Sequence, residues 1–181
     1  MSLIAVTDDV PVLARRLFHL GRQIKEGADL SPAYNLSGML YASKSGFLLL
    51  SVPNALVRGV FAAMDEPGIE LPPGPDDGPF EAHISVMRPE ELELIGGIDR
   101  ISERGKRFCY RLGGLVSTEP EQSSHSRVWM LRVHSPELQA LRRSYGLSSL
   151  PKDGEYDFHV TVAVRKRGVL GRNEKRKAAN A

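Results

Sequence analysis

Apolar residues recur at helical spacing in three segments of the chain. They fall on one face across residues 12–25, again across 54–64, and again after Ser135-Pro136. Proline lies at or just before the start of each segment, where it suits the first turn of a helix. We therefore predict three helices, the third of which ends near Gly146.

Six shorter runs have the aromatic, β-branched or alternating character of strands. They span residues 34–42, 47–52, 82–87, 108–116, 128–133 and 158–164. A turn at 43–46 joins the first two, which we expect to form a hairpin. Residues 71–79 (LPPGPDDGP) are the stretch richest in proline and glycine, and we predict an exposed loop there.

The order of these elements repeats in the two halves of the chain. Each half has two strands, a proline-initiated helix, a loop, and a strand that carries His-x-Ser/Thr. We place the halves at about 34–90 and 106–166 of a single domain over 1–181, with a basic tail at 167–181. The repeat predicts two similar lobes related by a pseudo-twofold axis, with the two histidine strands facing each other across a cleft.

The composition is that of a soluble globular protein. Of the 181 residues, 41% are hydrophobic and 25% charged, which excludes disordered, collagen-like and disulfide-rich classes. The single cysteine, Cys109, excludes an intrachain disulfide and fits a reducing compartment, and we expect its thiol to be buried. The start of the chain lacks the pattern of a signal peptide, and no apolar run is long enough for a bilayer. We expect a cytoplasmic protein without membrane contact.

The net charge of +2 is unevenly distributed. From Arg165 onward the chain has seven basic residues and a lone acidic one, Glu174. Such a tail either holds a polyanion or is a solvated terminus, and both interpretations stay open.

Two short motifs carry the candidate chemistry: His83-Ile84-Ser85 and His159-Val160-Thr161. In a strand, residues two apart point to the same face, so each histidine shares a face with a hydroxyl. One imidazole can take a proton from an attacking water or hydroxyl while the other donates a proton to the leaving oxygen. The hydroxyls of Ser85 and Thr161 can hold the phosphate oxygens. This chemistry requires neither a metal nor another cofactor.

The tetrapeptides HISV at 83–86 and HVTV at 159–162 resemble the signature of the 2H phosphoesterase superfamily. The resemblance implies an α+β, bilobal fold in which antiparallel sheets line a central cleft and helices lie outside. It also implies that His83 and His159 are the acid/base pair and that Ser85 and Thr161 bind phosphate, with Ser85 in place of the commoner threonine. The stand-alone-sized 2H domains of phage polyproteins are similar to this chain, which is compatible with a phage origin.

The same resemblance implies a substrate class. It is a 2′-linked or cyclic nucleotide phosphodiester, such as a 2′,3′-cyclic phosphate end of RNA, a 2′,5′-oligonucleotide or a cyclic oligonucleotide. The expected partner is therefore a nucleotide or RNA end, bound by a monomer.

Several further residues have two open interpretations. Arg88 and Arg165 follow the motifs and either contact a phosphate or are surface charges. Four aromatic residues either stack on a base or pack in the core or rim: Tyr34, Trp129, Tyr156 and Phe158. We assign no chemistry to the remaining histidines, including His125, which we place in a loop. Their spacing does not fit a zinc site.

Two alternatives to an enzyme remain. The same cleft could serve a non-catalytic nucleotide- or RNA-binding module, and an assay of turnover separates that alternative from catalysis. A protein-interaction domain would need exposed apolar patches, which the sequence does not obviously supply.

Overall fold

The computed structural model describes residues 36–121 and 123–168, except for the side chain of Asp77. The predicted helix at 12–25, Tyr34 and most of the basic tail lie outside the described residues.

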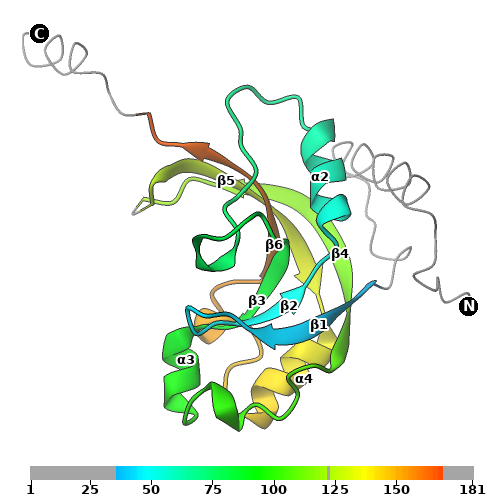
Figure 1. The fold of residues 1–181 in the computed structure, drawn as a ribbon, viewed down its shortest axis with the longest axis vertical. Coiled ribbons are helices and arrows are strands. Elements are labelled where there is room, and N and C mark those ends of the chain that lie inside the picture. The colour runs from blue at the N-terminus through cyan, green and yellow to red at the C-terminus, as the bar shows by residue number, and fades with distance from the viewer. Residues whose placement is uncertain (1–35, 122, 169–181) are drawn as a thin grey trace, which may run out of the picture.

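Six antiparallel strands form a sheet that closes on itself (Figure 1). They are β1 (Leu36–Ala42), β2 (Leu48–Ser51), β3 (His83–Met87), β4 (Arg107–Thr118), β5 (His125–His134) and β6 (Phe158–Lys166). Around the sheet the order is β1-β2-β3-β6-β5-β4, and β1 pairs with β4 to complete the ring. The six predicted strands and the β1–β2 hairpin are confirmed, with shifted ends.

Within the described residues, three α-helices accompany the sheet: α2 (Asn54–Ala63), α3 (Pro89–Leu94) and α4 (Pro136–Ser144). The predicted helices at 54–64 and after Ser135 are confirmed. Pro53 precedes the first turn of α2, and the Ser135 hydroxyl caps α4 by accepting a hydrogen bond from the Leu138 backbone N–H at 3.2 Å. The sequence analysis missed α3, because a six-residue helix is too short to show a periodic pattern. None of the described helices is long and apolar enough to span a membrane.

The hydrophobic core lies between the helices and one face of the sheet. It joins Leu56 and Val60 of α2 and Leu138 of α4 to Ile84 and Val160 of the sheet. Helix α2 contacts β6, while α4 contacts β3 and β4. The polar residues of the two motifs lie on the opposite face of β3 and β6.

A buried ion pair fixes the end of β3 against α3 and α4. Arg142 is fully buried, and its Nη2 donates to Glu91 Oε1 at 2.6 Å. Its Nη1 donates to the Val86 carbonyl at 2.7 Å, and other guanidinium N–H groups reach the carbonyls of Ser148 and Leu150. Burial raises the pKa of the Glu91 carboxyl, but the hydrogen bonds from Arg142 and from the Arg88 and Lys152 backbone outweigh it and leave that pKa below its usual value.

Two sequence predictions are wrong. Cys109 is exposed rather than buried, because Tyr110 and Leu112 point to the core and the alternation of β4 turns Cys109 outward. His125 is the first residue of β5 and not part of a loop.

The loop at 71–79 is tied to the β1–β2 turn and is only partly exposed. The Asp76 carboxylate accepts hydrogen bonds from the backbone N–H groups of Lys44 and Ser45 at 2.8 and 2.7 Å, and Pro72 and Gly74 are buried. These contacts join the loop to the β1–β2 turn.

A single closed sheet contains the strands of both halves. The internal duplication, the bilobal layout and the central cleft stay predictions, whereas the antiparallel α+β class is confirmed.

Candidate active site

The two histidine strands are neighbours in the sheet (Figure 1). β3 and β6 run antiparallel with Ile84 opposite Val160, and both of these side chains are completely buried in the core. Because successive residues of a strand point to opposite faces, the residues on either side of Ile84 and Val160 share the other face. These residues are His83, Ser85, His159 and Thr161, all half-buried.

Both imidazoles are anchored in the same way. His83 Nδ1 lies 2.8 Å from the Glu81 carbonyl oxygen, and His159 Nδ1 lies 3.0 Å from the Asp157 carbonyl oxygen. A carbonyl oxygen can only accept, so in this arrangement Nδ1 carries the proton that each ring donates. Nε2 is then the ring nitrogen that exchanges protons, as an acceptor in the neutral ring and as a donor in the cation.

The two hydroxyls beside the histidines are available to bind a ligand. Among the described residues, neither the Ser85 nor the Thr161 hydroxyl makes a hydrogen bond to protein. Both side chains are half-buried rather than enclosed. Each can therefore donate to an oxygen of a bound anion.

Two further residues face this site that the sequence analysis did not single out. On the outer sides of the histidine strands, Ser51 of β2 lies opposite His83, and Arg132 of β5 lies opposite His159. Cross-strand partners share a face, so both point to the histidine side. The signal for Arg132 was the alternation of buried Leu131 and Val133 around it, but its partner strand could not be inferred from local pattern.

Arg165 already has hydrogen-bond acceptors on the protein, and Arg88 has an ion-pair partner. Arg88 lies just after β3 and forms an ion pair with Glu90 at 2.7 Å. Arg165 donates from Nη2 to the Glu66 carboxylate at 3.1 Å and to the Pro67 carbonyl at 3.0 Å. A phosphate contact for either arginine stays a prediction.

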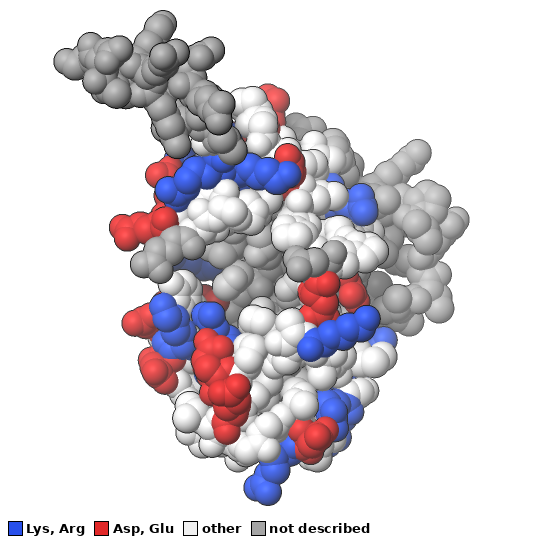
Figure 2. All heavy atoms as spheres, turned by 60° about the vertical axis from the view of Figure 1, so that its left-hand side comes forward, with Lys and Arg blue, Asp and Glu red and all other residues white. Residues whose placement is uncertain are grey.

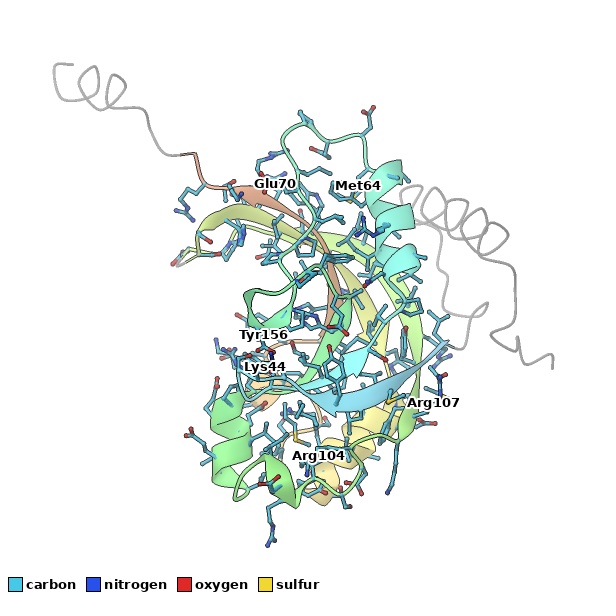
Figure 3. The ribbon with its side chains drawn as sticks, in the orientation of Figure 1. Lys44, Met64, Glu70, Arg104, Arg107 and Tyr156 are labelled. Atoms are coloured by element: carbon cyan, nitrogen blue, oxygen red, sulfur yellow. The ribbon has the colours of Figure 1, made fainter. Side chains whose placement is uncertain are left out.

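The aromatic candidates differ in exposure. Phe158 is 1% exposed and packs in the core, so the stacking interpretation is wrong for this residue. Trp129 is 6% exposed, and the Arg165 guanidinium lies 5.2 Å from its ring centre. Tyr156, labelled in Figure 3, is 48% exposed on the loop that leads into β6. Of the described candidates it therefore offers a base the most open ring.

Charge alone does not mark a binding face. In the view of Figure 2, basic and acidic side chains intermingle over the described surface. A recess lined by Met39, Tyr41 and Arg104, among others, includes neither histidine in its wall. Within 36–121 and 123–168, no three His, Cys, Asp or Glu side chains are grouped as metal ligands would be. The site is thus defined by the register of β3 and β6.

Comparison with protein families identifies this arrangement. Residues 59–170, more than half of the chain, match the family model of the Swiss Army Knife 2H phosphoesterase domain. The chain belongs to the 2H phosphoesterase superfamily. The matched segment includes both His-x-Ser/Thr motifs and both strands that carry them.

Membership of this superfamily indicates that the chain is a phosphoesterase. No curated protein and no solved structure matched the chain. The substrate and the roles of individual residues must therefore be argued from the geometry of the 2H domain itself.

Proposed function

We propose that this 2H domain is a metal-independent phosphodiesterase that hydrolyses a 2′-linked or cyclic nucleotide phosphodiester, with His83 and His159 as its acid/base pair. The observation that carries the proposal is the pairing of Ile84 with Val160, which gives both motifs one common face. With this register continued, His83 and His159 are diagonal neighbours. Such neighbours lie about 7–8 Å apart on an antiparallel pair, which leaves room for one phosphate between two imidazoles.

The anchored rings support a balanced proton transfer. Nε2 of the neutral histidine takes a proton from water as the water oxygen forms a bond to phosphorus. The bond from phosphorus to the leaving ribose oxygen breaks, and that oxygen takes the proton from Nε2 of the protonated histidine. Exchange of one proton with solvent restores both rings. Ser85 and Thr161 donate to the non-bridging oxygens, where negative charge increases in the transition state.

We further propose that the two halves are an internal duplication that meets in a cleft on the histidine face. Two features support this. The first half supplies β1, β2 and β3 and the second supplies β4, β5 and β6, in mirrored order around the ring. In both halves the histidine Nδ1 bonds to the carbonyl two residues earlier.

A panel assay tests the proposal. Purified protein is incubated in EDTA with nucleoside 2′,3′-cyclic phosphates, 2′,5′- and 3′,5′-linked dinucleotides and cyclic dinucleotides. We expect turnover of a 2′-linked or cyclic member and none of the 3′,5′-linked dinucleotide. Turnover that is absent in EDTA and appears only when a divalent ion is added in excess would contradict the metal-independent mechanism. Saturable binding without turnover would instead favour a nucleotide-binding module.

A further inference from the structure

Arg132 is the cation that the sheet register sets beside His159. The two residues are direct partners on β5 and β6, and such partners have Cβ atoms about 4.5–5.5 Å apart. The guanidinium is on the end of a long side chain and can therefore reach over the imidazole of its partner. We propose that Arg132 binds the non-bridging oxygens of the reacting phosphate next to His159. This inference rests on the proposed function and specifies how its site holds the anion.

The present acceptor of Arg132 is weak. Its Nε lies 3.8 Å from Asp157 Oδ2, and the two side chains are 61% and 55% exposed. An exposed pair at this distance contributes little and is screened by salt. A phosphate offers the planar guanidinium two parallel hydrogen bonds, which is a better geometry than the long contact to Asp157. Exchange of Asp157 for phosphate is therefore favourable.

The exchange does not disturb the histidine. His159 is anchored by the backbone carbonyl of Asp157, whereas Arg132 contacts the carboxylate of the same residue. Loss of the contact between Arg132 and the Asp157 carboxylate therefore leaves the imidazole anchor in place.

The stem of Arg132 is closely backed by β4. A Cβ built on Gly113 would lie 3.2 Å from the Arg132 Cβ, closer than side chains usually pack. Glycine at this position therefore leaves the room that the arginine stem occupies. This packing limits the directions in which Arg132 can extend.

Arg165 is more firmly held than Arg132, because it donates to Glu66 and Pro67 at 3.1 and 3.0 Å. Arg88 has an ion-pair partner in Glu90 at 2.7 Å, and it lies after the end of β3 rather than opposite a histidine. On the His83 side the equivalent position is Ser51, whose hydroxyl already accepts from the Met39 backbone N–H at 2.8 Å. Arg132 is therefore the guanidinium best placed to change its partner when an anion binds.

Substitution of Arg132 tests the inference on the substrate found in the panel assay. We expect Arg132→Gln to raise KM at least about tenfold, with a smaller change in kcat, because a charge-assisted hydrogen bond is lost. Arg132→Lys should recover part of the affinity, since it restores the charge but not the planar fork. Arg143→Gln, an exposed arginine on α4, is the matched control and should leave KM and kcat unchanged. An unaltered KM in Arg132→Gln would overturn the inference and leave the proposed function intact.

Binding of inorganic phosphate gives a second readout that needs no turnover. Titration of the His159 imidazole signals by NMR should show weaker phosphate binding in Arg132→Gln and two- to threefold tighter binding in Asp157→Asn, where the competing carboxylate is gone, on the order expected for an exposed pair. Melting temperatures should match the wild type, because the Arg132–Asp157 pair is exposed. Equal phosphate affinity in the wild type and Arg132→Gln would overturn the inference even if no panel member were hydrolysed.

Discussion

The two histidine strands are alike at the histidine and different around it. His83 and His159 sit in the same motif, bond through Nδ1 to a carbonyl two residues earlier, and share one face of the sheet. Their outer neighbours differ, since His83 lies opposite Ser51 and His159 lies opposite Arg132. In the proposed mechanism, proton transfer therefore needs both histidines, whereas the proposed arginine contact to the anion lies on the β6 side alone.

The supports behind the two strands differ as well. β3 has five residues, and the Arg142 guanidinium holds its Val86 carbonyl. β6 has nine residues and pairs along most of its length with β5. The shorter strand therefore has a buried ion pair in addition to its sheet pairing, while the longer one is held mainly by its extensive pairing with β5.

The largest expected effect tests the likeness of the two histidines. His83→Ala and His159→Ala should each lower turnover by about 10²–10⁴, the usual effect of removing a general acid or base. His134→Ala, an exposed histidine at the end of β5, is the matched control and should keep wild-type turnover. Steady-state assays on the panel substrate measure both. If either variant keeps wild-type turnover, His83 and His159 do not act as an acid/base pair.

Removal of Arg142 tests the support of β3. Arg142→Met should lower the free energy of unfolding by about 3–5 kcal/mol, because Glu91 would stay buried without its partner. Urea unfolding measures this loss, and Arg143→Met on the same helix is the exposed control. The double variant Arg142→Met with Glu91→Met should recover part of the loss, since no unpaired charge is then buried. If the double variant is as unstable as the single one, the loss of stability comes from the missing hydrogen bonds between Arg142 and the backbone carbonyls, and not from the unpaired charge of Glu91.

The hydroxyls should matter less than the imidazoles. Ser85→Ala and Thr161→Ala each remove one hydrogen bond to a charged phosphate, worth about 1.5–3 kcal/mol, and leave proton transfer intact. Rates should therefore fall by roughly 10- to 150-fold. Ser117→Ala, at an exposed position on β4, should have no effect. Larger losses than in the histidine variants would mean that the hydroxyls do more than hold oxygens.

Features set by neighbouring residues could be predicted from the sequence, and those set by distant contacts could not. The strands, the proline-initiated helices and the two motifs are local patterns, and the structure confirms the six strands and the helices at 54–64 and after Ser135. The register of Ile84 with Val160 joins residues 76 positions apart, and Arg142 reaches Glu91 from 51 positions away. Arg132 was missed for this reason, because its importance comes from the strand it lies against. The burial predicted for Cys109 was wrong because it relied on the usual burial of free cysteine and not on the alternation of buried and exposed residues along its strand.

The smallest effect follows from the carboxylate that supports β3. The pKa of Glu91 is below its usual value in the folded protein. Burial raises this pKa, but the hydrogen bonds from Arg142 and from the Arg88 and Lys152 backbone lower it by more than burial raises it. The unfolded chain therefore binds more protons than the folded one, and this contribution to stability is present above the ordinary glutamate pKa of about 4.3. It is lost as the pH falls below that value through the lower folded pKa. The loss should be smaller than in Arg142→Met, because Arg142 keeps its hydrogen bonds to the Val86, Ser148 and Leu150 carbonyls. Urea midpoints from pH 6 to pH 3 should fall less steeply in Glu91→Gln than in the wild type, while the exposed Glu93→Gln should follow the wild type. Parallel curves for all three proteins would show that Glu91 titrates alike in both states and that the β3 support is insensitive to acid.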